Sequence, residues 1–217
     1  MTSEPTLDDM REILAAELPQ HAAFDGWTAI ALERAAFAKG IDLAIASLAF
    51  PAGAPDMIDA WFAHVDDAML AALPAGTLAP MKIRDRITAL VQARLDIVAK
   101  DIEALRRALA VLAMPQNLTR AARLNWRAAD AMWVAAGDTA TDFNHYSKRA
   151  ILGGVYVATV MAMLSDESED RADTRAFLAR RIDGIMRFEK AKARFTHSAP
   201  DRLSLGRFLG RLRYPAV

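Results

Sequence analysis

The side chains that could carry metal or catalytic chemistry are few and scattered along this chain. The four histidines are His21, His64, His145 and His197. None has a partner at metal spacing: His64 lies near Asp66 and Asp67, but a single histidine with such neighbours is more typical of a helix surface than of a metal site. The chain has no cysteine, which excludes thiolate chemistry and disulfides. We therefore predict no metal, no cofactor and no catalytic residue, and a hydrolase remains an alternative only if distant residues converge.

Residues 126–149, WRAADAMWVAAGDTATDFNHYSKR, hold more aromatic, acidic and basic side chains than an amphipathic helix pair requires. Part of the acidity has a structural explanation, because Asp138 or Thr139 could cap the helix that follows Gly137. On that helix, His145 would share a face with Asp142 at i−3 and with Arg149 at i+4. This stretch is the first place to look for a binding surface.

Apolar side chains are in excess on the two helices expected around residues 118–136 and 140–164. They include Met132, Trp133, Val134, Tyr156, Val157, Val160, Met161, Met163 and Leu164. Gly153 and Gly154 lie in the middle of the second helix, where each glycine costs about 1 kcal/mol relative to alanine. Glycine there allows a backbone or a ligand to approach closely, and methionine adapts to flexible apolar guests. The residue types thus leave two interpretations open, a lipid cavity or a solid core with a tight helix crossing.

Residues 201–213, DRLSLGRFLGRLR, have the composition of an interfacial helix. The apolar side chains Leu205, Phe208, Leu209 and Leu212 follow helical spacing, and the basic ones are Arg202, Arg207, Arg211 and Arg213. Such a helix favours weak, reversible binding to an anionic membrane. The alternative is packing on the body of the protein or on a second copy, which would make a homodimer. Residues 196–201, THSAPD, resemble a hinge before it.

The elements that position these groups are predicted to be helices throughout. Apolar residues make up 53% and charged residues 25% of the 217 residues, the composition of a globular chain. Apolar spacing is helical and no alternating β-branched run occurs, so we predict an all-α fold. The expected helices are 6–18, 27–39, 42–49, 55–72, 82–98, 100–113, 118–136, 140–164, 171–194 and 201–212. We expect one domain over 1–195, with 1–52 as its helix-turn-helix-like part, and a hinge and amphipathic helix over 196–217.

The helix pair 27–39 and 42–49 has the layout of a DNA-binding helix-turn-helix, but its charges argue against that use. Residues 1–75 hold three basic and twelve acidic residues, a net charge of −9, and the remainder of the chain carries +9. The second helix, DLAIASLAF, has no basic residue, whereas DNA contacts need Arg or Lys. We predict a scaffold role and no nucleic-acid binding.

The amino-terminal residues MTSEPTLDDMREIL lack the basic start and apolar run of a targeting signal. No uncharged apolar run reaches about 18 residues, the length that a spanning helix needs. We therefore expect a cytoplasmic protein, peripheral on the inner face of the cytoplasmic membrane.

Two long blocks of this sequence resemble the Coq nine (COQ9) family, lipid-binding accessory proteins of ubiquinone biosynthesis. The first is residues 25–61, DGWTAIALERAAFAKGIDLAIASLAFPAGAPDMIDAW. The second is 126–149 together with AILGGVYVATVMAMLSDESEDRADTRAFLARRIDGI, which follows it. The resemblance implies a TetR-like all-α bundle, and a TetR-type lipid-sensing regulator is the alternative function.

The resemblance also implies the roles of particular residues. It implies that an isoprenoid lipid or quinone precursor binds in the body of the fold, where the candidates are Met132, Trp133, Gly153, Tyr156, Val157, Val160 and Met161. It implies presentation of this lipid to the di-iron demethoxyubiquinone hydroxylase, for which the candidate surface is Asp142, His145, Tyr146 and Arg149. His145 stands where the family has tryptophan. We expect this surface to be partly exposed and dispensable for folding. The membrane candidates are Leu205, Phe208, Leu209, Leu212, Arg207 and Arg211.

Overall fold

In the computed structural model, which describes residues 6–139 and 143–197, every regular element is a helix. The α-helices are α1 (Leu7–Asp25), α2 (Ala29–Lys39), α3 (Leu43–Ala49), α4 (Ala54–Ala72), α5 (Ala75–Leu78), α6 (Ile83–Val98), α7 (Ile102–Leu112), α8 (Leu118–Ala135), α9 (Phe143–Leu164) and α10 (Ala172–His197). Short 3-10 turns at Ala99–Asp101, Pro115–Asn117 and Glu169–Arg171 precede α7, α8 and α10. The predicted all-α class is confirmed for this part of the chain, and the short helix α5 was not predicted.

The chain divides into two compact units, residues 1–179 and 180–217, at a point inside α10. The predicted boundary at 195–196 lies further along the same helix, because α10 continues to His197. The amphipathic segment 201–213, with all its membrane-binding candidates, lies outside the described residues. Membrane binding by that segment therefore stays a prediction.

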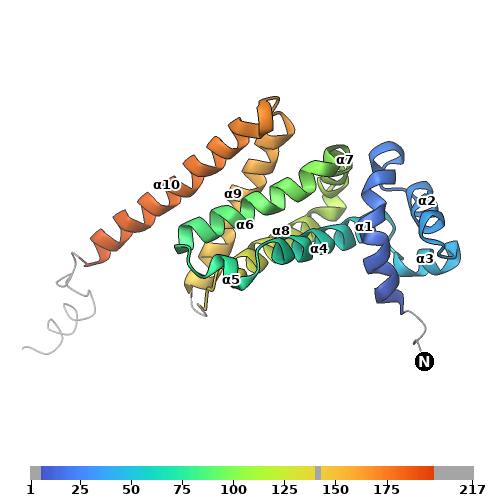
Figure 1. The fold of residues 1–217 in the computed structure, drawn as a ribbon, viewed down its shortest axis with the longest axis horizontal. Helices are drawn as coiled ribbons and strands as arrows, with labels where there is room; N and C mark the ends of the chain where they lie inside the picture. The colour runs from blue at the N-terminus through green and yellow to red at the C-terminus, as the bar shows by residue number, and fades with distance from the viewer. Residues whose placement is uncertain (1–5, 140–142, 198–217) are drawn as a thin grey trace, which may run out of the picture. The chain divides into compact units, whose positions relative to one another are not determined.

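Helices α1, α2 and α3 pack together at the amino-terminal end, as predicted for a helix-turn-helix-like unit (Figure 1). The turn between α2 and α3 is made at Gly40, whose φ of 65° is in the left-handed region that favours glycine. Side-chain oxygens of Thr28 and Asp42 cap the starts of α2 and α3 by accepting backbone N–H bonds. On α3 the side chains of Leu43, Ile45 and Leu48 are exposed, so the face that would meet DNA is apolar.

Helix α1 continues beyond its predicted end at residue 18 and runs through Pro19 to Asp25. Proline in a helix interior removes one hydrogen bond and costs about 3 kcal/mol. Here Leu14, Leu18 and Ala22 are fully buried at four-residue spacing on both sides of Pro19. Burial of this continuous stripe against α2, α4 and α7 offsets the cost, because the stripe exists only if the helix continues.

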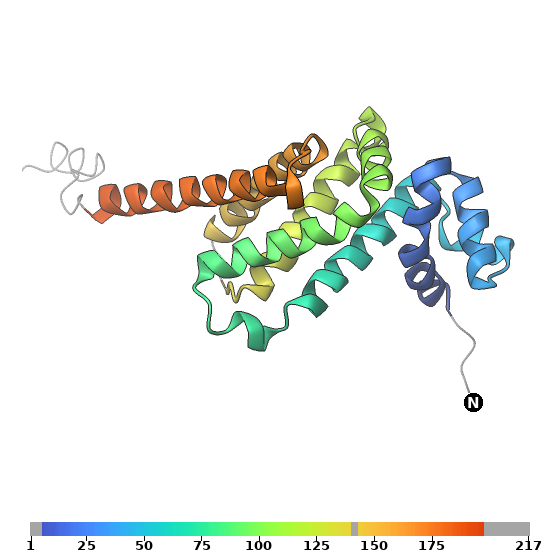
Figure 2. The same ribbon diagram turned by 45° about the horizontal axis from the view of Figure 1, so that its top comes forward.

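A pair of tryptophans connects the amino-terminal helices α1 to α3 to the helices that follow them. Trp27 lies 5.2 Å from Trp61 of α4 between ring centroids, and its Nε1 donates to the carbonyl of Ala104 on α7 at 3.0 Å. Both indoles are buried. Helices α4, α6, α8 and α9 form the body, in which α4 contacts α6 and α8, and α8 contacts α9 (Figure 2).

Polar contacts fix the end of α8 and the turn that follows α9. Gly137, with φ of 90°, follows α8, and Arg86 of α6 donates to the carbonyl of Ala136 at 2.9 Å. After α9, the carboxylate of Asp166 accepts bonds from the backbone N–H groups of Ser168 and Thr174, at 2.9 and 2.8 Å. The hydroxyls of Ser168 and Thr174 donate to it as well, and these bonds hold the pKa of Asp166 well below its usual range.

Candidate functional site

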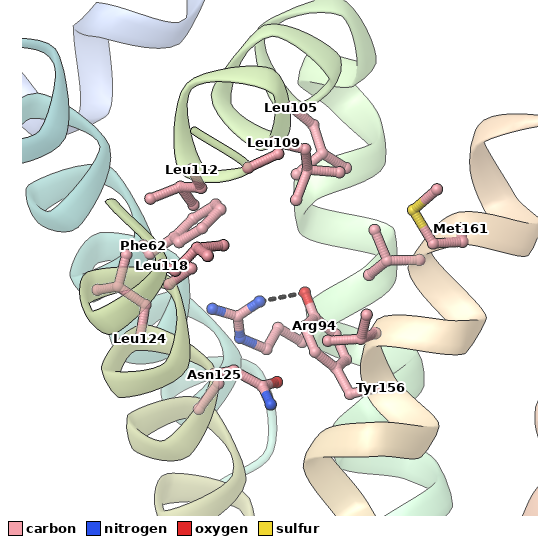
Figure 3. Close-up of a pocket in the computed structure, with 15 residues that line it drawn as sticks. Phe62, Arg94, Leu105, Leu109, Leu112, Leu118, Leu124, Asn125, Tyr156 and Met161 are labelled. Carbon is pink, nitrogen blue, oxygen red and sulfur yellow. Dashed lines mark hydrogen bonds between the residues drawn. The ribbon is translucent and has the colours of Figure 1, made fainter. Parts of the chain in front are cut away.

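The main candidate site is an apolar pocket of about 360 Å³ within the body. Five helices contribute its walls, with α7, α8 and α9 providing most of the surface (Figure 3). It is lined by Phe62, Arg94, Leu105, Leu109, Leu112, Ala113, Leu118, Ala121, Leu124, Asn125, Ala128, Tyr156, Val157, Val160 and Met161. This volume is at the lower end of ordinary ligand pockets, which span about 300–1,000 Å³.

Burial varies across the pocket lining. Leu105 and Ala128 are each 1% exposed, whereas Leu118, Val157 and Met161 are 56%, 47% and 58% exposed. The first two belong to the interior and the other three to the mouth. Such large exposed apolar side chains on the rim of an apolar pocket suit an apolar guest that extends past the rim.

Three lining residues have polar side chains, Arg94, Asn125 and Tyr156. Arg94 of α6 is 2% exposed, its Nε donates to Oδ1 of Asp66 at 2.8 Å, and its Nη1 donates to the hydroxyl of Tyr156. The guanidinium also lies over the Tyr156 ring, 4.7 Å from its centroid. The buried charge is thus paired and hydrogen-bonded, as buried charges must be.

The predicted lipid-binding residues divide between the pocket and the core around it. Tyr156, Val157, Val160 and Met161 line the pocket. Met132 is fully buried and outside the lining, so it is a core residue. Trp133 is also outside the lining, and its Nε1 donates to the carbonyl of Lys148 at 3.1 Å. Gly153 is buried, and the side-chain amide of Asn125 occupies the space next to it.

The sequence did not predict that α4, α6 and α7 would contribute side chains to the pocket. The signal that could have found the α7 wall was the repeated apolar spacing of Leu105, Leu109 and Leu112. That spacing marks one face of a helix but does not tell a pocket wall from a solid core. Arg94 gave a clearer signal, because an arginine follows Leu90 and Val91 within the apolar stripe of α6.

Of the predicted partner-binding residues, Asp142 lies outside the described residues. Tyr146 is 62% exposed on α9 and forms an aromatic surface with its neighbours. Its ring centroid is 5.0 Å from that of His145 and 6.1 Å from that of Trp126 on α8. Trp126, His145 and Tyr146 are called the aromatic surface from here on.

Arg149 does not belong to that surface, and the expectation of an exposed side chain is wrong for it. It is 2% exposed. Its Nε donates to Asp130 at 2.5 Å and its Nη1 donates to Asp138 at 3.1 Å. Helical spacing correctly placed Arg149 one turn after His145. Sequence spacing could not show that the carboxylates of Asp130 on α8 and Asp138 after it pair with the guanidinium in the protein interior.

Two other features bear on metal and membrane chemistry. Among the described residues, no group of three His, Cys, Asp or Glu side chains is arranged to hold a metal ion. The stretch His145–Leu164 of α9 is long and apolar enough to cross a membrane, with a mean hydropathy of 1.2. It includes Lys148 and Arg149, and 44% of it is buried inside the protein. It also packs against α8, as a core helix of a bundle does.

Comparison with known proteins matches the segment that contains α8 and α9 to a protein family. Residues 118–189, which include α8 and α9, match the COQ9 family. The mitochondrial ubiquinone biosynthesis protein COQ9 of Rattus norvegicus is 35% identical over 184 residues, 80% of this chain and 57% of the relative. The corresponding protein of Homo sapiens is 32% identical over 168 residues, 74% of this chain and 52% of the relative. The chain therefore spans little more than half the length of these curated relatives.

The fold also has a solved counterpart. A TetR transcriptional regulator from Nitrosomonas europaea superposes with a TM-score of 0.65 and 24% identity, covering 80% of this chain and 96% of that chain. The match confirms the predicted TetR-like fold and carries no functional conclusion. The resemblance seen in the sequence is thus confirmed, and this chain is a TetR-like homologue of the COQ9 proteins.

Proposed function

We propose that this chain is a non-catalytic accessory protein of ubiquinone biosynthesis. In this proposal it holds an isoprenoid lipid or quinone intermediate at the membrane surface and presents it to the di-iron demethoxyubiquinone hydroxylase. The observation that carries the proposal is the apolar pocket, because α8 and α9 supply most of its lining and both belong to the segment that matches the COQ9 family. The curated relatives are named as ubiquinone biosynthesis proteins.

The shape of the pocket supports a long-chain ligand. A volume of about 360 Å³ holds only part of a polyisoprenoid, so the remaining chain would pass over Leu118, Val157 and Met161 at the mouth. Each of these side chains is about half exposed and would lose water contact when the chain lies on it. Fully burying an apolar side chain of this size is favourable by about 1.5–3 kcal/mol, so covering the exposed half of each contributes roughly half of that.

The aromatic surface supports a protein partner near the same helices. Tyrosine and tryptophan are common anchors of protein interfaces, and Tyr146 and Trp126 are 62% and 37% exposed. The hydroxylase is the partner that the family resemblance implies. His145 in place of the expected tryptophan makes this surface less apolar than the family's. We also propose that residues 201–213, outside the described residues, bring the chain to the membrane.

The alternative, a TetR-type lipid-sensing regulator, has less support. Helix α3 presents Leu43, Ile45 and Leu48 to solvent, and its seven residues, Leu43–Ala49, include no arginine or lysine. Without basic side chains, the helix cannot neutralise phosphates. A chain with this fold can therefore retain the helix pair without using it to bind DNA.

Native mass spectrometry of the purified chain mixed with extracted lipids tests the pocket directly. We expect isoprenoid lipids or quinones to bind at one copy per chain. The variant Val157→Asp places a carboxylate at the mouth and should lower lipid occupancy at least fivefold. Val134→Asp is the matched control, because Val134 is 59% exposed on α8 and does not line the pocket. Absence of any bound isoprenoid or quinone from the wild-type protein would overturn the proposal.

A further inference from the structure

The polar side chains of the pocket are gathered on one side of an otherwise apolar lining. Arg94 from α6, Asn125 from α8 and Tyr156 from α9 converge there from three helices (Figure 3). A pocket that only needed to hold hydrocarbon would gain nothing from them, because burying polar groups costs free energy unless they are paired. Their pairing therefore shows what kind of ligand group they can receive.

The charge in this cluster is already balanced. Arg94 is paired with Asp66, whose other carboxylate oxygen accepts a bond from Nε of Arg127 at 3.2 Å. Arg127 in turn pairs with Asp59 at 2.5 Å. Two arginines thus face two aspartates. Arg94 and Asp66, the two members nearest the pocket, are buried, so a phosphate or carboxylate on a ligand would add an uncompensated negative charge at low dielectric, which is unfavourable.

Tyr156 offers a hydrogen-bond donor to a ligand. Its hydroxyl oxygen accepts the bond from Arg94, and a hydroxyl that accepts a bond keeps its own proton for donation. Burial raises the pKa of Tyr156, although the adjacent Arg94 opposes this shift. The phenol is therefore protonated at neutral pH and can donate to an oxygen of a ligand.

Asn125 offers the matching acceptor. Its side-chain oxygen Oδ1 is buried and has no hydrogen-bond partner among the described residues. An unpaired buried acceptor is unfavourable, and a donor on the ligand would remove that cost. The position of the amide depends on Gly153, because a Cβ at residue 153 would stand 2.6 Å from Nδ2 of Asn125. Alanine at 153 would force the amide to move.

We propose that the pocket selects an amphiphile with an uncharged hydroxyl-bearing head, such as an alcohol or a phenol. The head donates to Oδ1 of Asn125 and accepts from the hydroxyl of Tyr156, and the apolar chain points to the mouth. This inference rests on the proposed function, because it names the ligand class of the same pocket. It assigns Asn125 and Tyr156 as residues that determine specificity, and Gly153 as a positioning residue.

Four probes that share one isoprenoid chain test the head group by isothermal titration calorimetry. They are farnesol, farnesyl methyl ether, farnesene and farnesyl phosphate. The ether accepts but cannot donate, the hydrocarbon can do neither, and the phosphate is charged. Farnesol should bind about fivefold to thirtyfold more tightly than the ether, the equivalent of the one net buried hydrogen bond that the ether cannot donate, and should exceed the hydrocarbon by at least as much. Farnesyl phosphate should bind no more tightly than the hydrocarbon.

Three variants test the residues. Asn125→Leu removes the amide, and Gly153→Ala displaces it without changing it, so both should bind farnesol and farnesyl methyl ether with nearly equal affinity. Gly154→Ala is the matched control, because it makes the same substitution in the same helix and nothing lies within 4 Å of the added methyl. It should keep the wild-type preference. Alanine favours helix over glycine, so both glycine variants should remain folded.

The outcomes separate this inference from the proposed function. If the wild-type protein binds the alcohol, the ether and the hydrocarbon equally, the pocket is a lipid site and the head-group inference is wrong. The inference is also wrong if farnesyl phosphate binds most tightly, or if Gly153→Ala and Asn125→Leu both keep the preference for farnesol. If none of the four probes binds, the proposed lipid site itself fails.

Discussion

Arg94 on α6 and Asp66 on α4 form a buried ion pair, with Nε 2.8 Å from Oδ1 and both side chains less than a tenth exposed. Because Arg94 also donates to Tyr156, this pair links α4 and α6 to α9, the helix that supplies one wall of the pocket. Stability and ligand binding therefore depend on the same guanidinium, and each can be tested separately.

Removal of the carboxylate should destabilise the fold. Asp66→Ala leaves Arg94 buried without its counter-charge, and breaking a buried pair in this way lowers the free energy of unfolding by about 3–5 kcal/mol. Asp67→Ala removes the adjacent, exposed carboxylate and should change it by less than about 0.5 kcal/mol. Urea denaturation followed by circular dichroism measures both. Equal stability of the two variants would mean that the ion pair contributes nothing.

Of the predicted partner-binding residues, we expect Arg149 to stabilise the fold and Tyr146 to contribute to partner binding without being needed for stability. Arg149→Glu places a third acid beside Asp130 and Asp138 in a buried position, and should lower the free energy of unfolding by about 3–5 kcal/mol. Tyr146→Ala alters a side chain that is 62% exposed and should cost less than about 1 kcal/mol.

Tyr146→Ala is therefore the variant with which to test the hydroxylase contact. We expect it to reduce co-purification of the hydroxylase while the melting temperature falls by only a few degrees. Full retention of the hydroxylase by this variant would remove the aromatic surface from the proposal.

Helical periodicity predicted the bounds of α2, α3, α4 and α8 to within about two residues, because their caps and apolar faces are local signals. It placed the end of α1 at Pro19, because a local rule about proline cannot weigh the buried stripe that Leu14, Leu18 and Ala22 form. The same limit applies to the site. The α9 wall of the pocket was predicted, whereas Arg94 and Asn125 were missed, since their roles depend on contacts between helices that are far apart in sequence.

The turn before α10 should make stability depend on pH in the acid range. The hydroxyls of Ser168 and Thr174 hold the pKa of Asp166 below its usual range, so the ionised form is favoured in the folded state. The unfolded state then binds the proton more tightly, and stability rises with pH. The contribution is present above the unfolded pKa of about 3.9 and is lost as the pH falls below it.

Asp166→Asn imitates the protonated carboxyl and should reveal this dependence. Its melting temperature should be lower than that of the wild type at neutral pH, and the difference should shrink as the pH falls below about 4. Glu167→Gln, a change at the adjacent exposed residue, should show no such gap. A gap between Asp166→Asn and the wild type that stays constant with pH would contradict the role given to the carboxylate.

Duplex DNA should not bind. Residues 1–75 carry a net charge of −9, and α3 exposes leucine and isoleucine where a DNA reader needs basic side chains. Electrophoresis at about 50 mM salt, where phosphate contacts are strongest, should therefore show no shift with micromolar protein. A shift specific to one sequence would favour the regulator over the accessory protein.

The quinone profile of cells tests the central claim, that lipid held in the pocket is what this chain contributes to ubiquinone biosynthesis. Cells whose sole copy is Val157→Asp should accumulate the demethoxy intermediate and lose ubiquinone. Cells with Val134→Asp at the same protein level should keep the wild-type profile. A normal profile in cells that contain the Val157→Asp protein, after its loss of lipid has been confirmed by mass spectrometry, would contradict the account.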